Sequence, residues 1–222
     1  MIIAIDGPAG SGKSTVAKML AKHLGIRYLD TGAMYRALTW KAMQHKVNLD
    51  DERALCRLMD QTKIHFHYKE KGLLVFVDDK NVTHEIRSPS VTNNTHYISS
   101  KPGVRAVMVN LQREFALEGD TVAEGRDMGT VVFPDAEKKF FLDARIEERA
   151  KRRFYESESS NNENSFDGVL QEIELRDQRD TTRKESPLKI SADSIYIDTT
   201  DLTINEVLHR IIKEVEPLMK NK

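Results

Sequence analysis

The stretch between residues 2 and 15 constrains the fold more than any other part of the chain. Four apolar residues, IIAI, are followed directly by DGPAGSGKST. A short continuous apolar run is typical of a strand buried on both faces of a parallel sheet. Residues 7–14 match G-x-x-x-x-G-K-[ST] in full, and apolar residues at helical spacing then run up to Gly25. The order of strand, glycine-rich loop and helix predicts a phosphate-binding loop inside a βαβ unit.

The glycine-rich loop has the chemistry of a nucleoside triphosphate site. Glycines let successive backbone N–H groups converge on an anion, and the N-terminus of the helix adds partial positive charge. Lys13 is expected to contact the β- and γ-phosphates of ATP, and the Ser14 hydroxyl to join the shell of a Mg²⁺ ion. A glycine-rich turn without a ligand explains neither the lysine nor its position. The residues predicted to bind the triphosphate are Gly7, Pro8, Ala9, Gly10, Ser11, Gly12, Lys13, Ser14 and Thr15.

Further apolar runs predict the rest of a sheet. Several of these runs are followed, after a loop, by a pattern of apolar residues at helical spacing. Strands that alternate with helices indicate an α/β fold with a doubly wound parallel sheet of five strands. The runs that follow the first strand are residues 26–29, 121–123, 139–142 and 194–197.

Two segments depart from this alternation. Residues 63–83 alternate apolar and polar side chains around a turn, which predicts an antiparallel hairpin in a small inserted β lobe. His65 and His67 alternate there, and an exposed strand face explains them better than a metal site does. Residues 156–165 are polar, which fits a short mobile lid or, equally, a plain disordered connection. We expect one domain over 1–222, with an insertion at about 61–101 and a lid at about 147–166.

Composition limits the class of partner and the compartment. Lys and Arg (34) nearly balance Asp and Glu (35), so the chain lacks the basic excess of a general nucleic-acid binder. Its single cysteine, Cys56, has no partner for an internal disulfide or a cysteine-based metal site. No apolar run reaches the roughly 18 residues of a membrane helix, and the N-terminus lacks a basic signal region. We expect a cytoplasmic monomer that binds neither nucleic acid nor membrane.

A second set of side chains predicts an anion site beside the triphosphate. The segments at 30–37 and 124–136 each leave a strand at the edge where ligands of doubly wound folds bind. Near the end of the chain, three charged residues recur at i, i+4 and i+7, which would place them on one helix face. For these three a solvated, salt-bridged surface is an equal alternative. The residues gathered in this way are Thr31, Tyr35, Arg36, Arg126, Asp127, Arg176, Asp180 and Arg183.

Four stretches of the chain resemble the bacterial cytidylate (CMP) kinase family of P-loop nucleoside monophosphate kinases. In chain order they are GPAGSGKST, DTGAMYRAL, GRDMGTVVFPDA and RDQRDTTR with SPL after it. The resemblance extends over essentially the whole chain and includes an insertion in the monophosphate-binding region. It implies transfer of the γ-phosphoryl group of ATP to CMP or dCMP in pyrimidine nucleotide metabolism. Carried over by motif, the monophosphate site would consist of Thr31, Tyr35, Arg36, Arg105, Arg126, Asp127, Arg176, Asp180 and Arg183.

The residue types fit the roles that this resemblance implies. The phosphate of CMP must approach a triphosphate, so arginines are needed to neutralise both, and Arg36, Arg126 and Arg183 are the candidates. Asp180 can accept hydrogen bonds from ribose hydroxyls, with Arg176 one turn away to orient it.

The base requires its own contacts. Cytosine presents a donor at N4 and acceptors at N3 and O2, which Asp127 and Arg105 together could read. Uracil would offer Asp127 a carbonyl instead. The chain departs from the family at Glu124, where an aspartate is common, and near His96, where the family often has a small hydroxyl residue. His96 is therefore interpreted as a surface or helix-packing residue.

The helix that enters the polar segment carries further arginines. Arg149 and Arg153 share one face, and either could stabilise charge on the transferring phosphoryl group if the segment closes as a lid. A solvated basic helix paired with glutamates is a comparable reading. The residues predicted to act in catalysis are Lys13, Arg126, Arg183, Arg149 and Arg153.

Other functions fit the phosphate-binding loop alone. One is a kinase for another small acceptor, such as UMP, AMP or shikimate. Another is a nucleotide-dependent switch or a nucleic-acid-binding regulator, which would lack a productive second anion site. Near-neutral charge and the clustered arginines argue against the latter class.

Overall fold

The computed structural model describes residues 1–69, 72–158 and 165–219. The chain divides into two compact units, one formed by Met1–Leu29 with Ala116–Lys222 and the other by Asp30–Phe115. The turn predicted within 63–83 and most of the polar stretch in the predicted lid lie outside the described residues. The division into one domain with an insertion at about 61–101 stays a prediction.

The first unit is built on a five-stranded sheet with the order β2-β6-β1-β7-β8. β1 pairs in parallel with β6 on one side and β7 on the other, and β7 pairs in parallel with β8. This confirms the predicted α/β fold and parallel sheet, including each predicted strand to within one or two residues. The strands are β1 (Ile2–Asp6), β2 (Arg27–Asp30), β6 (Thr121–Gly125), β7 (Lys138–Asp143) and β8 (Ile195–Asp198).

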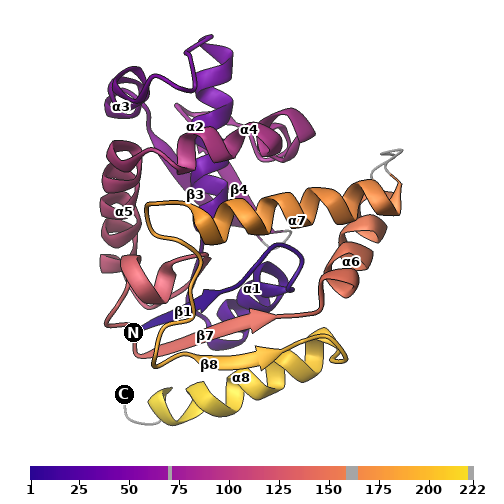
Figure 1. The fold of residues 1–222 in the computed structure, drawn as a ribbon. Helices are drawn as coiled ribbons and strands as arrows, with labels where there is room; N and C mark the ends of the chain where they lie inside the picture. The colour runs from indigo at the N-terminus through magenta and orange to yellow at the C-terminus, as the bar shows by residue number, and fades with distance from the viewer. Residues whose placement is uncertain (70–71, 159–164, 220–222) are drawn as a thin grey trace. The chain divides into compact units, whose positions relative to one another are not determined.

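Helices cover the sheet of this unit. α1 packs against β1 and β6, and α8 packs against α1 and β7, so these two helices share one face of the sheet (Figure 1). The side chains of Ile3 and Ile5 are fully buried, as expected for a strand covered on both faces. The helical elements are α1 (Lys13–Leu24), a π-helical turn η2 (Met128–Val132), α6 (Ile146–Glu158), α7 (Phe166–Thr182) and α8 (Ile204–Met219).

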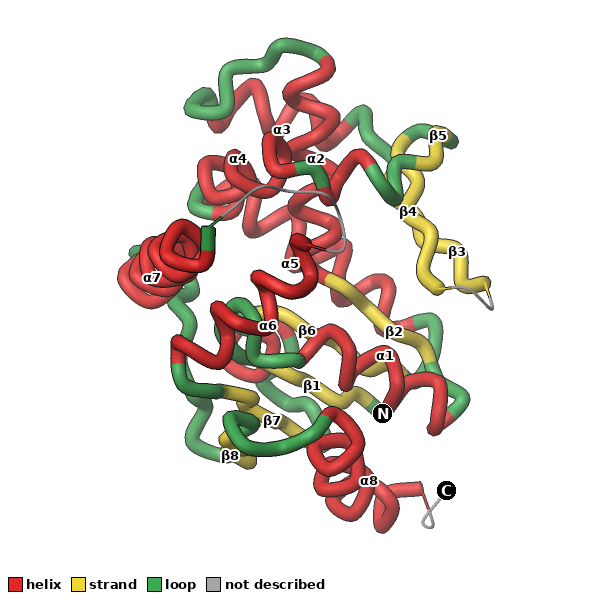
Figure 2. Tube along the Cα trace, turned by 90° about the vertical axis from the view of Figure 1, so that its right-hand side faces the viewer, coloured by secondary structure: helices red, strands yellow, loops and turns green. Residues whose placement is uncertain are grey.

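The second unit combines helices with a three-stranded antiparallel sheet in the order β3-β4-β5 (Figure 2). This sheet confirms the predicted antiparallel lobe. The apolar face of the hairpin packs with α2, and Val75 and Val77 lie in one core with Trp40. The elements are α2 (Thr31–Gln44), α3 (Glu52–Asp60), β3 (Ile64–Lys69), β4 (Gly72–Val77), β5 (Lys80–Asn81), a 3₁₀ turn η1 (Glu85–Arg87), α4 (Pro89–Ser99) and α5 (Pro102–Leu117).

The opposite face of the hairpin carries the two strand histidines. His65 is the cross-strand neighbour of Phe76, and its ring stacks on that phenyl ring with centroids 5.2 Å apart. His67 meets the same phenyl ring edge-on at 4.9 Å. The aromatic contacts account for both side chains. In the described part of the chain, no helix is long and apolar enough to span a membrane.

Candidate active site

The phosphate-binding loop connects β1 to α1 and depends on glycines for close packing. Gly7 has φ 152°, and a Cβ atom there would lie 2.1 Å from the carbonyl oxygen of Leu142. Gly10 has φ 77°, and its Cβ would lie 2.8 Å from the carbonyl oxygen of Arg149. Any other residue at these positions would clash with backbone atoms, which do not move cheaply. The loop is therefore held between β7 and α6, with its amides free of side-chain bulk.

Lys13 is buried at the start of α1. Its Nζ donates a hydrogen bond to the carbonyl oxygen of Pro8 over 3.1 Å, which folds the side chain back along the loop. Burial, followed by the positive charge of Arg126, lowers the pKa of Lys13 to about 7. Arg176 acts in the same direction, and the carboxylates of Glu124 and Asp180 act against it. An anion bound at this loop would therefore favour protonation of Lys13.

Ser14 is joined to the sheet through a carboxylate. Its hydroxyl donates to Oε1 of Glu124 over 2.6 Å, and the hydroxyl of Tyr28 donates to the same oxygen over 3.1 Å. Glu124 is buried near the carboxyl end of β6, the strand next to β1. A hydroxyl and a carboxylate at this point supply two oxygen donors of the kind that hard divalent cations prefer.

An arginine–carboxylate pair joins the end of β6 to α7. Nε of Arg126 donates to Oδ2 of Asp180 over 2.7 Å. Burial acts to raise the pKa of Asp180, but Arg126 and Arg176 outweigh it, and the net direction is downward. Asp180 is therefore a carboxylate at neutral pH, and it holds the guanidinium of Arg126 in place.

Asp127 forms an ion pair with Arg183, with 3.6 Å between Oδ1 and Nη2. Arg176 and Asp180 lie on α7, which ends at Thr182, and Arg183 follows as its C-cap with φ −58° and ψ 140°. The N–H of Arg183 still donates to the carbonyl oxygen of Arg179 over 3.0 Å, and its charge acts on Asp180 together with that of Arg176. At the C-terminus of α7 the hydroxyl of Thr182 donates to the carbonyl oxygen of Gln178. A side-chain bond of this kind competes with the backbone hydrogen bonds of a regular helix.

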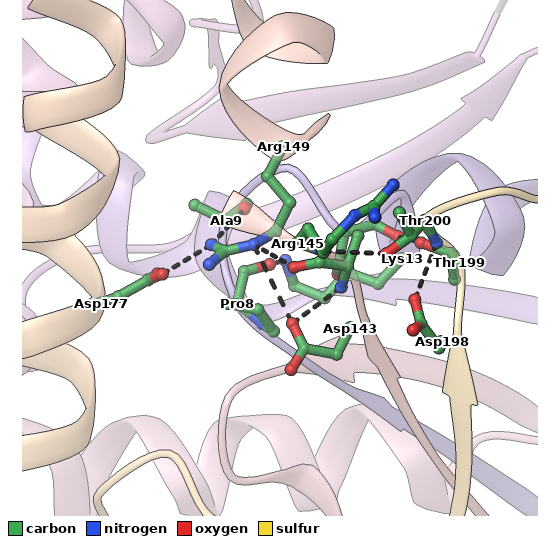
Figure 3. A network of polar contacts seen from close by, with 12 residues as sticks. Pro8, Ala9, Lys13, Asp143, Arg145, Arg149, Asp177, Asp198, Thr199 and Thr200 are labelled. Carbon is green, nitrogen blue, oxygen red and sulfur yellow. Dashed lines mark hydrogen bonds and ion pairs between the residues drawn. The ribbon is translucent and has the colours of Figure 1, made fainter. Parts of the chain in front are cut away.

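The two arginines predicted for the lid have different surroundings. Arg149 is buried, and its Nη1 donates to Oδ2 of Asp177 over 2.6 Å and to the carbonyl oxygen of Ala9 over 3.2 Å. Figure 3 shows this guanidinium between Asp177 and the phosphate-binding loop. Arg153 instead pairs with Glu156 in an exposed i, i+3 contact. Of the two, only Arg149 touches the loop.

A second arginine of α6 reaches the loop through a relay. Nη1 of Arg152 donates to Oγ1 of Thr199 over 2.9 Å, and its Nη2 donates to the carbonyl oxygen of Thr199 over 2.6 Å. The Thr199 hydroxyl donates to the carbonyl oxygen of Ser11 over 3.2 Å. The loop between β8 and α8 is thereby tied both to α6 and to the phosphate-binding loop.

Three of the predicted substrate residues of the second unit, Thr31, Tyr35 and Arg36, stand in the first turns of α2, and the fourth, Arg105, stands on α5. Asp30 caps this helix by accepting the N–H of Ala33 over 2.7 Å, and Nη2 of Arg36 pairs with the same carboxylate over 3.2 Å. The guanidinium of Arg105 lies 5.7 Å from the centre of the Tyr35 ring. Thr31 is buried at the first position of α2. These four predicted residues therefore lie in one unit.

The pattern of phosphate-binding loop, Ser14–Glu124 pair and buried arginine–carboxylate pairs agrees with the comparison with known proteins. A family model described as cytidylate kinase matches residues 3–217. The chain belongs to the cytidylate kinase family. Two curated relatives named cytidylate kinase, from Streptococcus pneumoniae strains 70585 and Hungary19A-6, are each 49% identical over 218 residues, which is 98% of both chains. This confirms the family predicted from the sequence.

The chain also resembles a solved structure with which it shares less sequence identity than with these relatives. An uncharacterised protein from Eubacterium ventriosum ATCC 27560 superposes with a TM-score of 0.52 at 17% identity, covering 97% of this chain and 98% of the other. At this identity the likeness supports the fold alone.

Sequence reasoning missed the contacts of several polar residues in this family member. Asp6 and Glu124 stand at or near the carboxyl ends of buried strands, and a charge in that position was a usable signal. Asp177 and Thr199 accept hydrogen bonds from Arg149 and Arg152, side chains that lie 28 and 47 positions away in the sequence. No local pattern in the sequence predicts such contacts.

Proposed function

We propose that the protein transfers the γ-phosphoryl group of ATP to CMP or dCMP, giving CDP or dCDP and ADP. The observation that carries this proposal is the concentration of Arg126, Arg176 and Asp180 around Lys13 in one unit. The cluster places two guanidinium groups beside the lysine of the triphosphate loop, where the phosphate of an acceptor must be neutralised as it approaches. The names of the 49% identical relatives support the same acceptor.

ATP is the proposed donor, bound by residues 7–15, where every residue except Pro8 offers a backbone N–H. Lys13 is protonated when phosphates are bound, and it contacts the oxygens around the phosphorus that is transferred. The bond that forms joins an oxygen of the CMP phosphate to the γ-phosphorus, and the bond that breaks joins that phosphorus to the β–γ bridging oxygen. ADP takes the electron pair as it leaves. No general base is needed, because the attacking oxygen belongs to a phosphate dianion.

Mg²⁺ fits the oxygen donors of this site. The Ser14 hydroxyl and the Glu124 carboxylate, 2.6 Å apart, are the residues proposed to hold the ion, the second directly or through water. When bound, the ion neutralises charge on the β- and γ-phosphates.

The CMP phosphate and ribose are assigned to arginines and one carboxylate. We propose that Arg36, Arg126 and Arg183 neutralise the phosphate, and that Asp180 accepts hydrogen bonds from the ribose hydroxyls. Asp180 suits this role because arginines keep it ionised. Arg176 supports it electrostatically.

The cytosine base is assigned to Asp127 and Arg105. Asp127 is proposed to accept from the N4 amine, and its ion pair with Arg183 supports an ionised carboxylate. Thr31 and Tyr35 are proposed to line the CMP site from α2. A site that hydrogen-bonds one group rejects an analogue lacking it far better than an apolar pocket does. UMP is therefore expected to be a poor acceptor.

The segment at about 147–166 is proposed as a lid, with Arg149 as its catalytic arginine. The contact of Arg149 with the Ala9 carbonyl supports this choice over Arg153. We further propose that the protein acts as a cytoplasmic monomer in pyrimidine nucleotide metabolism, without nucleic-acid or membrane partners.

A coupled assay of ADP release tests the function. It compares CMP, dCMP, UMP, AMP, GMP and shikimate as acceptors at equal concentration with ATP and Mg²⁺. Rapid ADP release with CMP and dCMP, and slow release with the others, is expected. Equal rates with UMP or AMP would overturn the base assignment, and release only with shikimate would overturn the proposal.

A further inference from the structure

Asp6, the last residue of β1, carries a buried carboxylate that serves a distant segment. Its Oδ1 accepts the N–H of Met128 and its Oδ2 accepts the N–H of Gly129, both over 2.8 Å. The two donors are consecutive backbone amides 122 and 123 positions along the chain. Each carboxylate oxygen thus has one amide partner, in a symmetrical two-pronged contact.

The two amides stand at the start of the π-helical turn η2. The residues just before this turn are Arg126 and Asp127, and Asp127 itself has φ −141° and ψ 25°. The side chain of Asp127 makes no capping bond to the turn. The first amides of a helical turn need an acceptor when they are buried. Asp6 supplies it from β1, so the turn does not depend on the Asp127 side chain for its cap.

The surroundings of Asp6 give this carboxylate little other support. Its register partners are Gly125 on β6 and Phe141 on β7, and neither carries a charge. The charges that act on it are those of Asp127 and Arg126, with opposite signs. Burial, only partly offset by the two amides, raises the pKa of Asp6 to about 6. An asparagine or an apolar residue would be easier to bury, so the retained charge indicates a task that needs two acceptor oxygens.

We propose that Asp6 is a positioning residue that fixes the Arg126–Asp127 segment for the phosphate and base of CMP, by binding the Met128 and Gly129 amides. This inference rests on the proposed function, because it names what sets the acceptor residues in place. The carboxylate also stands directly before Gly7. Asp6 therefore connects the start of the triphosphate loop to the segment assigned to the acceptor, and fixes the position of one relative to the other.

The test compares Asp6→Asn with the wild-type chain and with Asp51→Asn as a matched control. Asp51 caps α3 by accepting the N–H of Ala54 over 2.9 Å, and asparagine is an equally good cap there. Asp6→Asn keeps the shape of the side chain but offers one acceptor oxygen instead of two. We expect kcat/KM for CMP to fall at least tenfold, as for the loss of one hydrogen bond to a charged group, with the KM for ATP within twofold. Asp51→Asn should leave both constants unchanged.

Amide hydrogen exchange gives a readout that does not depend on activity. Exchange at Met128 or Gly129 should accelerate about tenfold in Asp6→Asn, and the NMR signal of the Arg126 Nε–H should shift. Unchanged exchange and an unchanged Arg126 signal would overturn the proposal, whether or not CMP proves to be the acceptor. Equal losses for CMP and ATP would also overturn it, since Asp6 would then act on the phosphate-binding loop. If the wild-type chain has no activity with CMP, the proposed function fails. The exchange data then still test whether Asp6 holds the Met128 and Gly129 amides.

A measurement on the wild-type chain covers the case in which Asp6→Asn does not fold. The amides of Met128 and Gly129 should both exchange slowly with solvent, because each donates to one oxygen of Asp6 over 2.8 Å. Rapid exchange at both amides would contradict the two-pronged contact.

Discussion

Nε of Arg126 lies 2.7 Å from Oδ2 of Asp180, which joins the end of β6 to α7 by a largely buried ion pair. The pair has two consequences. It fixes a guanidinium near Lys13, where it helps to lower the pKa of the lysine, and it keeps a carboxylate ionised beside a cluster of arginines. Both groups are thus prepared for a ligand that carries phosphates and hydroxyls.

The first prediction concerns Asp180 and the ribose. Asp180→Asn preserves the shape of the side chain but removes a charge-assisted acceptor. The KM for CMP should rise about tenfold more than the KM for dCMP, because only CMP has a 2′-hydroxyl to lose. Thermal unfolding of the variant controls for loss of the Arg126 pair. Equal losses for both nucleotides would mean that Asp180 only orients its neighbours.

The second prediction links ATP affinity to pH through Lys13. The free chain holds Lys13 with a pKa of about 7, and bound phosphates favour its charged form. Affinity for ATP should therefore fall as pH rises, by about fivefold between pH 7 and pH 8. Calorimetry in buffers of different ionisation enthalpy should show proton uptake on binding.

Lys13→Met is the control for this titration, since the phosphates of ATP also titrate near neutral pH. It should bind ATP weakly, without the excess proton uptake, and should lose transfer activity while remaining folded. Proton uptake of the same size in Lys13→Met would show that the lysine is not the group that titrates.

The third prediction separates the two arginines of α6. Arg149→Ala should lower kcat by at least 10²-fold, because this guanidinium contacts the phosphate-binding loop at Ala9. Arg153→Ala serves as the matched control on the same helix. Its partner Glu156 is exposed, so a change of less than twofold is expected. Similar losses in both variants would assign the effect to the charge of the helix as a whole.

The fourth prediction concerns stability. The folded pKa of Asp6, about 6, lies above its ordinary value of 3.8. Between these values the folded chain binds more protons than the unfolded chain, so this group adds stability as pH falls. Relative to Asp6→Asn, the free energy of unfolding of the wild-type chain should increase by about 1 kcal/mol from pH 7.5 to pH 5. A difference that stays constant across this range would mean that Asp6 does not titrate in the folded state.

Local patterns were sufficient for much of the fold. β1 and α1 are specified by the run Ile2–Asp6, by the glycines of the loop and by the helical spacing after Ser14. These three local features all favour the same strand, loop and helix. The antiparallel hairpin followed from alternation in the same way.

What could not be predicted depends on partners far apart in the chain. The i, i+4, i+7 spacing predicted a helix that includes Arg183, but α7 ends at Thr182 and Arg183 is its C-cap. Helix ends are set by capping and tertiary contacts, which spacing does not report. The bonds of Asp6 to Met128 and Gly129 likewise arise from strand order, since β1 and β6 become neighbours only in the folded sheet.

The most direct measurement is the identity of the product formed from a mixture. Anion-exchange chromatography of a reaction that contains ATP, Mg²⁺ and equal concentrations of CMP, UMP and AMP, with Lys13→Met as the blank, separates CDP, UDP and ADP as they form. We expect CDP and ADP to accumulate in equal amounts, with UDP at least tenfold lower and no product in the blank. Formation of UDP at the same rate as CDP, or of CDP in the Lys13→Met reaction, would contradict a phosphate-binding-loop kinase that selects cytosine.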